Sequence, residues 1–487
     1  MLTRKFTGWL LAAAVGLLSL IPAGQTLAVS AHPPLFESPA VVDQETAASD
    51  SISTSTSIST SISTTATAAT TTTAPSASGT FDETGSQENH TVSGGSSSSP
   101  SGAAGTRPGT TAPSRAPTSS MTSSATTTST TKKPSIPSAA PGKIVVGYYG
   151  GWSAYSGYTP DKIPAAQLTQ VHYAFATINT STHRVVLADP AQDRRNFEAF
   201  RRLKQSYPHL RVLLSVGGWD YSAGFSAAAA TAASREAFAQ SCLDLVLQYG
   251  LDGVDIDWEY PVSGSGGRPA DRQNFTLLLQ AIRTKFDAQG AKDGNRYLLS
   301  AAISGSASYL KNIELKKVAA VTDTLFLMAY DLHGPWDSYA DLLAPLYTPS
   351  AASPQYKTSV DEMVSRLLSA GAPANKLVLG MPFYGYLYTG VSGNGLYSRF
   401  SSAKSVSYST IVSSYLNKPG LTAGLHAEAR VPTLSGNGMF LTYENPASIG
   451  EKAAYARKRG LAGVGAWELS QDRSGALLAS ARRSFLG

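Results

Sequence analysis

A short strand-like segment followed by a longer helical segment recurs along the chain after residue 142. The strand-like runs are rich in β-branched and aromatic residues, and there are eight of them: KIVVGYYGGW, QVHYAFATI, RVLLSVGGW, GVDIDWEY, YLLSAAIS, TLFLMAYDLHG, KLVLGMPFYGY and GVGAWEL. Amphipathic stretches such as DRRNFEAFRRLKQSYP and DRQNFTLLLQAIRTKFDAQG lie between them. Strands that alternate with helices predict parallel pairing, and eight such units predict a closed (β/α)8 TIM barrel of the α/β class.

The main alternative is an open, doubly wound sheet. Such a sheet needs a phosphate-binding glycine-rich turn that opens a helix, and the chain has no GxGxxG motif. The barrel also accounts for the polar residues, because barrels build active sites at the C-terminal ends of their strands. Seven candidate site residues fall at such ends: Asp255, Asp257, Glu259, Tyr330, Asp331, Tyr384 and Trp467.

One interval breaks the alternation. Residues 387–441 show no clear strand–helix pair and are rich in Tyr, Gly and Ser. This pattern predicts a small insertion after the seventh strand, placed to wall one side of the barrel mouth.

The N-terminal part of the chain has a different composition. Residues 1–28 combine Arg4 and Lys5 with a short apolar run and small residues, which is typical of a secretory signal peptide cleaved near Ala28. Residues 29–141 are dominated by Ser, Thr, Ala, Gly and Pro, so we expect a disordered stalk. The expected mature protein is secreted, with no membrane span after cleavage and with residues 142–487 as its globular domain.

The charge distribution gives no sign of a nucleic-acid partner, and the cysteine content limits how the domain is stabilised. Residues 142–487 carry 33 Lys/Arg and 26 Asp/Glu, without a basic cluster that would predict a nucleic-acid partner. Cys242 is the only cysteine, which excludes an intramolecular disulfide, and its helical spacing predicts burial. We expect a monomer held together by a large apolar core.

The segment GLDGVDIDWEYP places acidic residues at alternate positions of an otherwise apolar strand. Asp255, Asp257 and Glu259 therefore share one face, with neighbours about 6.6 Å apart at roughly 3.3 Å per residue. Three carboxyl groups this close in a partly dry site cannot all ionise easily, so at least one pKa should rise. A raised carboxyl pKa is what a general acid needs at neutral pH.

The acidic row and several residues near it also have non-catalytic interpretations. An acidic sheet edge fits poorly because a closed barrel has no edge, and no histidine cluster accompanies the row to suggest a metal; we expect neither metal nor cofactor. His172 and His333 are interpreted as structural, and Trp258 and Phe175 as core or as a wall of the site. The spacing alone leaves an ordinary acid–nucleophile pair of Asp257 and Glu259 open.

The stretch Asp252–Glu259, DGVDIDWE, resembles the signature of glycoside hydrolase family 18, the chitinases and their relatives. SVGGW, MAYD and MPFYG, together with Trp467 in GAWEL, extend the resemblance over about residues 143–487. It implies that Glu259 protonates the glycosidic oxygen and that Asp257 orients and stabilises the substrate's acetamido group. Asp255 would tune Asp257. The substrate's own acetamide would then be the nucleophile.

The resemblance also implies a set of sugar-binding residues. Tyr330 and Asp331 would contact the acetamido group, and Trp467 would form the floor beneath the reacting sugar. The full expected set, beside catalytic Tyr330, is Tyr148, Phe175, Trp219, Tyr260, Met328, Asp331, Tyr384, Glu428 and Trp467. The insertion looks like a reduced form of the family's own, and Thr433 and Tyr386 depart from common Trp and basic residues.

The resemblance implies a secreted, endo-acting chitinase that cleaves β-1,4-linked N-acetylglucosamine with retention, with chitin or chitooligosaccharides as partners. An endo-β-N-acetylglucosaminidase acting on glycoproteins or peptidoglycan is a second interpretation. A chitin-binding lectin without activity is a third, which the presence of Glu259 disfavours.

Overall fold

The computed structural model describes residues 143–352 and 357–487. The predicted signal peptide (1–28) and stalk (29–141) lie outside the described residues. Within the described ranges, none of the helices combines the length and hydropathy needed to cross a bilayer.

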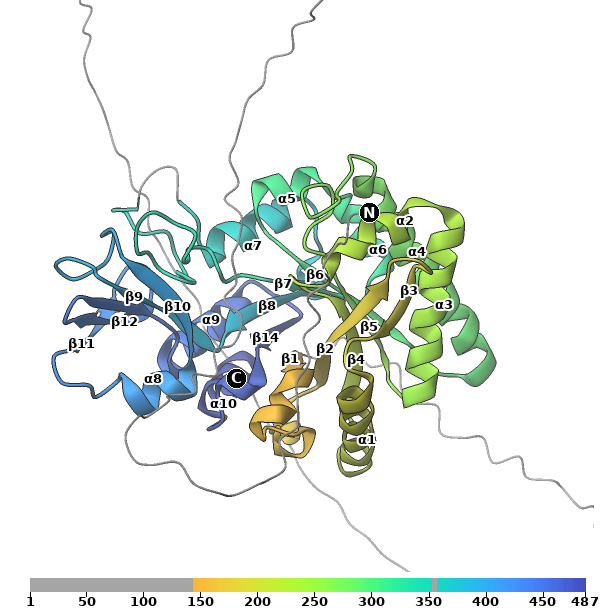
Figure 1. Cartoon of the computed structure of the whole chain (residues 1–487), viewed down its shortest axis with the longest axis horizontal. Helices are drawn as coiled ribbons and strands as arrows, with labels where there is room; N and C mark the ends of the chain where they lie inside the picture. Colours follow the sequence, from red (N-terminus) through yellow and green to blue (C-terminus); the bar gives the residue numbers. More distant parts are fainter. Residues whose placement is uncertain (1–142, 353–356) are drawn as a thin grey trace, which may run out of the picture. The chain divides into compact units, whose positions relative to one another are not determined.

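The core of the structure is a closed parallel barrel (Figure 1). Its eight strands are β1 (Ile144–Gly150), β2 (Gln170–Asn179), β4 (Arg211–Gly217), β5 (Gly253–Asp257), β6 (Leu298–Ile303), β7 (Thr324–Leu327), β8 (Leu377–Pro382) and β14 (Gly463–Trp467). Strand β1 pairs in parallel with both β2 and β14, which closes the sheet on itself. The predicted (β/α)8 TIM barrel is confirmed, and each predicted run contains one barrel strand.

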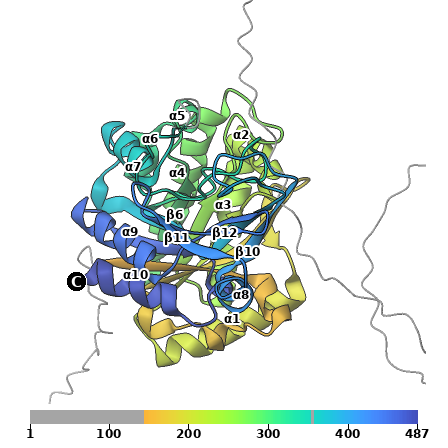
Figure 2. The same cartoon turned by 90° about the vertical axis from the view of Figure 1, so that its left-hand side faces the viewer.

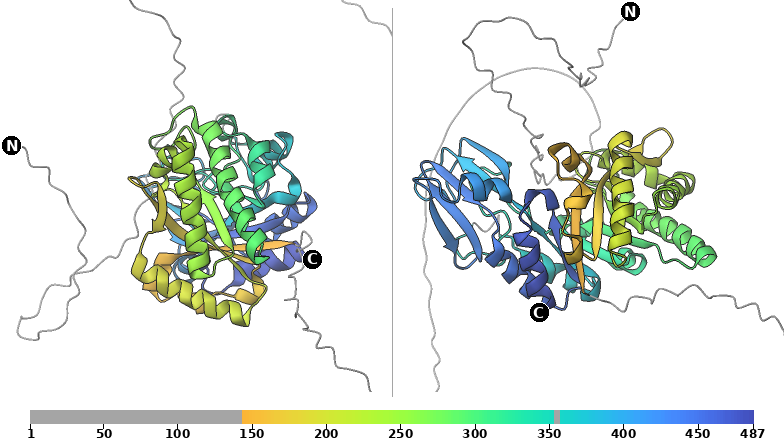
Figure 3. Two further views of the ribbon diagram at one scale, coloured as in Figure 1. Left: turned by 90° about the vertical axis from the view of Figure 1, so that its right-hand side faces the viewer. Right: turned by 90° about the horizontal axis from the view of Figure 1, so that it is seen from below.

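The connecting helices cover the outside of the barrel (Figure 3, left). They are α1 (Pro190–Ser206), α2 (Phe225–Ala230), α3 (Ala232–Tyr249), α4 (Asp271–Asp293), α5 (Ala307–Lys311), α6 (Leu315–Val321), α7 (Val360–Ser369), α9 (Pro446–Lys458) and α10 (Ala476–Leu486). Local sequence sets their starts: Thr231 and Ser234 form a capping box at α3, and Asn445 caps α9 with Pro446 in its first turn. Such caps satisfy helix N–H groups that have no partner inside the helix.

The apolar face of β5 packs on these helices as predicted. Val254 and Ile256 are fully buried, and the Trp258 ring stacks 5.2 Å from Phe225 and meets Phe275 edge-on. Cys242 is buried in the same core. Because one face of β5 is anchored in this way, its alternate side chains are directed into the barrel.

A five-stranded antiparallel sheet follows β8, the seventh barrel strand (Figure 2; Figure 3, right). It consists of β9 (Tyr384–Thr389), β10 (Ser402–Ser407), β11 (Thr422–His426), β12 (Val431–Gly436) and β13 (Met439–Thr442), with α8 (Tyr408–Ser414). The predicted α+β insertion after the seventh strand is confirmed, but it begins at β9 rather than at residue 387. The run 376–386 is two strands that part at Phe383, whose N–H donates to the carbonyl of Trp467 (2.8 Å).

A further strand, β3 (Arg184–Leu187), was not predicted. It pairs antiparallel with the C-terminal end of β2 and does not belong to the ring of eight parallel strands. Four residues are too short to show a pattern in sequence.

Candidate active site

The acidic residues of β5 lie together at the C-terminal end of that strand. Asp255 is fully buried and Asp257 is 3% exposed, while Glu259 follows the strand and is partly exposed. Asp255 points into the barrel, because its side-chain partners lie on β1, β2 and β4.

Asp255 is the deepest member and has three partners. Its Oδ2 accepts hydrogen bonds from the Tyr148 hydroxyl (2.7 Å, on β1) and the Ser215 hydroxyl (2.8 Å, on β4). His172 on β2 places Nδ1 at 3.4 Å from the same oxygen. Burial raises the pKa of Asp255, but the effects of His172 and the hydrogen bonds outweigh burial and leave this pKa below its usual value. The structure adds to the interpretation of His172 as structural that its ring lies beside the buried carboxyl group of Asp255.

Asp257 lies in the middle of the row, and its carboxyl group lacks the hydrogen bonds that Asp255 has. Its Oδ1 is buried without a hydrogen-bond partner among the described residues. Burial first, and then the charges of Glu259 and Asp255, raise the pKa of Asp257 well above its usual value. A carboxyl group in this state binds a proton more readily than an ordinary aspartate and can offer an unsatisfied oxygen to a ligand.

Glu259 completes the row at the barrel mouth. Burial of its carboxyl group raises the pKa of Glu259 to about 7; Tyr260 opposes this by a hydrogen bond, and the charges of Asp331 and Asp220 add to it. The backbone N–H of Glu259 donates to Ser222 Oγ (2.9 Å), which holds the main chain in place. A carboxylic acid that keeps its proton up to neutral pH can act as a general acid there.

The glycines of SVGGW allow β4 to approach the row. Gly217 has φ +106°, and a Cβ there would lie 2.1 Å from the carbonyl oxygen of Asp257. Gly218 donates its N–H to that same oxygen (2.8 Å). Only glycine fits such a close approach of two backbones, so this motif positions Asp257.

Aromatic rings form one side of the site. Trp467 lies 5.2 Å from Tyr148 and stacks on Phe175 at 5.6 Å and 28°. Trp152 joins them, with its ring 6.3 Å from Phe175 and 6.4 Å from Trp467, and it is 49% exposed. Trp152 was missed as a site residue, although it ends the first strand-like run as Trp219 ends the third.

The opposite side is built by the segment after β7 and by β9. Asp331 has φ +54° and is exposed, and its Oδ1 accepts from the hydroxyls of Tyr384 (2.6 Å) and Tyr386 (2.8 Å). The Tyr330 ring stands edge-on to Tyr384 at 6.4 Å. A strained φ at a non-glycine residue is held only where surrounding contacts over-determine it. Tyr386 supplies one of those contacts, which the sequence did not predict.

The remaining predicted site residues, Met328, Tyr260, Trp219 and Glu428, differ in their contacts. Met328 packs at the edge of the aromatic cluster, and Tyr260 meets Tyr309 edge-on at 5.6 Å. Trp219 is partly exposed just beyond β4, and among the described residues no ring of the cluster lies against it. Glu428 is exposed on the insertion and accepts from the N–H (2.6 Å) and hydroxyl (2.9 Å) of Ser350. The roles of Trp219 and Glu428 in sugar binding therefore stay predictions.

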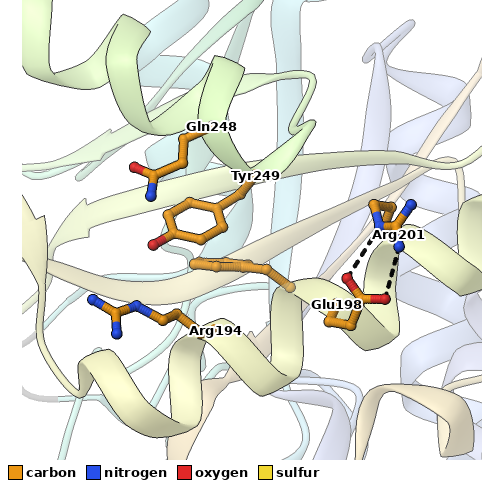
Figure 4. Close-up of a pocket in the computed structure, with 6 residues that line it drawn as sticks. Arg194, Glu198, Arg201, Gln248 and Tyr249 are labelled. Carbon is orange, nitrogen blue, oxygen red and sulfur yellow. Dashed lines mark hydrogen bonds and ion pairs between the residues drawn. The ribbon is translucent and has the colours of Figure 1, made fainter.

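Two further features concern other kinds of site. Within residues 143–352 and 357–487, no group of three or more His, Cys, Asp or Glu side chains could hold a metal ion. A pocket of about 250 Å³ lies between α1 and the end of α3 (Figure 4), lined by Arg194, Phe197, Glu198, Arg201, Gln248 and Tyr249. Its only acid, Glu198, is paired with Arg201 (2.8 Å), so this pocket lacks the proton-holding carboxyl groups of the row.

Neighbouring carboxyl groups with raised pKa values, beside stacked aromatic rings at the C-terminal end of a (β/α)8 barrel, suit a barrel glycoside hydrolase. The sequence pattern of Glycosyl hydrolases family 18 matches residues 144–472, and the chain belongs to that family. The predicted membership of glycoside hydrolase family 18 is confirmed.

Individual relatives agree with this assignment. The chain is 38% identical over 407 residues to Chitinase A1 of Niallia circulans, which covers 70% of this chain but 58% of that relative, less than two thirds of its length. Chitinase B of Serratia marcescens is 33% identical over 68% of this chain and 78% of its own. The solved Group IV chitinase of Ostrinia furnacalis in complex with allosamidin matches with 31% identity and a TM-score of 0.66, over 70% of this chain and 98% of that one.

A solved structure with another activity in its description is also similar. The family 18 N-acetylglucosaminidase of Paenibacillus barengoltzii is 32% identical with a TM-score of 0.64, over 70% of this chain and 99% of that one.

Proposed function

We propose that the protein is a secreted chitinase that hydrolyses β-1,4-linked N-acetylglucosamine polymers with retention, using the substrate's acetamide as nucleophile. The observation that carries the proposal is the acidic row of β5, in which Glu259 keeps its proton to about pH 7 beside Asp257, whose pKa is also raised. The chitinases among its relatives support the choice of substrate.

The first step breaks the glycosidic bond. Glu259 donates its proton to the bridging oxygen, so the leaving sugar departs as a neutral alcohol. The acetamide carbonyl oxygen attacks C1 of the reacting sugar and closes a positively charged oxazolinium ring. Asp257 accepts a hydrogen bond from the acetamide N–H and stabilises this charge. Asp255 tunes Asp257 and is itself held by Tyr148, Ser215 and His172.

The second step returns the enzyme to its starting state. A water attacks C1 from the side that the leaving sugar vacated, and Glu259, now a carboxylate, takes one proton from it. The ring opens, the acetamide is restored and C1 keeps its original configuration. Two inversions at C1 therefore give net retention without a covalent bond to the protein.

Sugar binding follows from the two sides of the site. The rings of Trp467 and Phe175 offer an apolar surface to the face of the reacting sugar, and the buried ring of Tyr148 packs against Trp467. Asp331, held by Tyr384, and the hydroxyl of Tyr330 offer polar contacts to the acetamido group. Trp219 and Glu428 are proposed to contact more distant sugars.

The proposal is tested by product analysis. The protein is incubated with chitin oligomers, an N-glycoprotein and peptidoglycan, and the products are identified by mass spectrometry. We expect cleavage of the oligomers within the chain, with the β-anomer appearing first by NMR. Release of single sugars from chain ends would favour the N-acetylglucosaminidase activity of the Paenibacillus barengoltzii relative, and cleavage of the glycoprotein or peptidoglycan alone would reject chitin as substrate.

The nucleophile is tested separately. A thiazoline analogue of the cyclised intermediate should inhibit competitively, because it resembles a state nearer the transition state than the substrate is. Oligomers deacetylated at the sugar on the C1 side of the scissile bond should resist cleavage there. A glycosyl ester on Asp257, trapped with a fluorosugar, would instead establish the ordinary acid–nucleophile pair.

A further inference from the structure

Two tyrosines of the insertion hold one oxygen atom of Asp331. Tyr384 and Tyr386 are two residues apart on β9, so their side chains lie on the same face of that strand. Their hydroxyl groups donate to the same Oδ1, at 2.6 Å and 2.8 Å, and their rings are 5.8 Å apart. Because both hydrogen bonds go to Oδ1, Oδ2 of Asp331 is left for a ligand.

The side chain of Tyr386 is itself fixed by the insertion. It is 4% exposed, and β9 lies between β10 and β13, with Tyr386 opposite Ser405 on one and Thr442 on the other. Its ring meets Trp336 edge-on at 5.9 Å and 88°. Trp336 belongs to the same segment after β7 as Asp331, so Tyr386 contacts this segment through both its hydroxyl and its ring.

Asp331 depends on such support because its own backbone is strained. Its φ of +54° lies in the left-handed region, which residues other than glycine seldom adopt. Its side chain is exposed at the barrel mouth, and the two hydroxyls that reach it come from residues 53 and 55 positions further along the chain. The hydrogen bonds from β9 therefore help to fix the carboxyl group.

Both supporting groups are neutral. Burial and the charge of Asp331 raise the pKa of Tyr384 and that of Tyr386 above the ordinary value, so both remain hydrogen-bond donors. Loss of surrounding water raises the pKa of Asp331, and the two hydrogen bonds oppose this effect. Within the described ranges, no Lys, Arg or His contributes to that pKa. The negative charge of Asp331 is in turn one cause of the raised pKa of Glu259.

We propose that Tyr386 is a positioning residue for the reaction, which fixes Asp331 as an ionised partner of the reacting sugar without supplying a cation. The proposal rests on the proposed function, because it assumes that Asp331 contacts the acetamido group. A neutral donor suits this place, because a cation beside Asp331 would offset the negative charge that helps Glu259 to keep its proton. Tyr386 itself takes no part in the bond-breaking steps.

The titratable groups that face Asp331 come from three parts of the barrel mouth. Tyr330 belongs to its own segment, Glu259 follows β5, and β9 supplies Tyr388 beside the two tyrosines that bond to it. The pKa of each tyrosine is raised above its ordinary value, so all of them stay neutral up to pH 9. Glu259, with a pKa of about 7, is therefore the group whose titration has to be separated from that of Asp331.

The experiment compares Tyr386→Phe, Tyr388→Phe and the wild type in the full chain. Phe keeps the ring that packs on Trp336 and removes only the hydroxyl. Tyr388 is the matched control, because it is buried on the same face of β9 and its hydroxyl does not bond to Asp331. Urea unfolding checks that both variants are folded.

The ratio kcat/KM for chitin oligomers is measured from pH 4 to 9, since it reports titrations of the free enzyme. In Tyr386→Phe the acidic limb should move up by about one pH unit, because a carboxylate that loses a hydrogen bond holds its proton more tightly. On that limb kcat/KM should fall about tenfold, while the alkaline limb set by Glu259 stays in place. Tyr388→Phe should follow the wild type. A merely structural defect would lower the whole profile without moving either limb.

A second measurement does not depend on activity. Aspartate labelled with ¹³C at Cγ is incorporated into the protein, and the resonance of Asp331 is assigned with Asp331→Asn. Its titration midpoint should rise by about one pH unit in Tyr386→Phe and stay unchanged in Tyr388→Phe.

The outcomes separate two kinds of failure. With an active wild type, an unchanged acidic limb or an unchanged Asp331 midpoint in Tyr386→Phe would overturn the positioning role. A wild type that neither binds nor cleaves chitin oligomers, but whose Asp331 midpoint moves in Tyr386→Phe, would reject the proposed function while leaving the support of Asp331 by β9 established.

Discussion

The two ends of β5 carry acidic residues in opposite circumstances. Asp252, at the N-terminal end, accepts hydrogen bonds from Lys204 (2.6 Å), Arg211 (3.1 Å) and the N–H of Val212 (2.8 Å). At the C-terminal end, no Lys, Arg or His within the described residues acts on the carboxyl groups of Asp257 and Glu259. One strand thus carries a neutralised acid at the bottom of the barrel and proton-holding acids at the top.

A second strand shows that the lower arrangement is not an isolated case. Asp323, just before β7, pairs with Arg283 (3.1 Å) and Arg296 and accepts from the N–H of Leu299 (2.8 Å). Acids at the lower rim bind cations and neighbouring backbone, which ties strands and helices together. Barrels separate stability at one rim from chemistry at the other, and in this chain Asp252 and Asp323 at the lower rim contrast with Asp257 and Glu259 at the upper rim.

The largest effect should follow from Glu259→Gln. The amide matches the acid in shape but cannot donate the proton, so kcat for unactivated chitin oligomers should fall by about 10²–10⁴-fold. Substrate affinity, measured by calorimetry, should be retained. Near-native turnover would show that Glu259 is not the general acid. The proposed contrast between the two ends of β5 would then fail.

Asp257→Asn should be the next largest in effect. An amide cannot supply the negative charge that balances the oxazolinium, so kcat should fall by about 10²–10³-fold, the range seen when one stabilising group of a charged intermediate is removed. The thiazoline analogue should also bind more weakly to this variant. Normal affinity for the analogue together with lost turnover would point to covalent chemistry at Asp257.

Asp252→Asn should affect stability and leave the chemistry intact. Removing the charge leaves Lys204 and Arg211 without their shared partner, which should lower the free energy of unfolding by about 1–2 kcal/mol in this partly exposed setting. Urea unfolding measures the loss, and kcat per folded molecule should match the wild type. A selective loss of kcat without a loss of stability would show that the lower rim takes part in catalysis.

The last prediction concerns how the free energy of unfolding of Glu259→Gln depends on pH. Because the pKa of Glu259 is raised to about 7, its proton stabilises the fold at low pH, and this contribution is lost as pH rises through 7. Glu259→Gln should therefore gain about 1–2 kcal/mol relative to the wild type between pH 4 and pH 8, allowing for partial exposure of the carboxyl group. For Glu314→Gln the sign should reverse, because the bond from Lys317 holds the pKa of Glu314 below its usual value.

The barrel could be predicted because its signal is local and repeated. Each strand–helix unit shows its own pattern in the sequence. The alternation of Asp255, Asp257 and Glu259 was enough to predict the carboxylate face of β5. The insertion was harder to delimit, since β8 and β9 form one apolar run in the sequence. They part at Phe383, whose backbone pairs with Trp467 and Tyr408.

Contacts across the barrel could not be predicted from local patterns. Tyr148 and Asp255 are 107 residues apart in the chain, and they meet because β1 closes the sheet and brings its inward side chains opposite those of β5. The approach of His172 to Asp255 and that of Trp152 to Trp467 depend on the same closure. The hydrogen bonds from Ser350 to Glu428, 78 residues apart, could not be predicted either.

That closure also sets the order in which the protein can fold. Strand β1 pairs with β14 from Ile144 opposite Gly463, and Lys143 donates to the carbonyls of Phe485 and Leu486 near the last residue of the chain. At roughly 5–20 residues per second, synthesis of the intervening segment takes about 15–60 s. Throughout that time β1 has one unpaired edge, and such edges invite aggregation. Folding of the first strand is therefore coupled to arrival of the last, and a chain shortened before β14 should stay open and depend on chaperones.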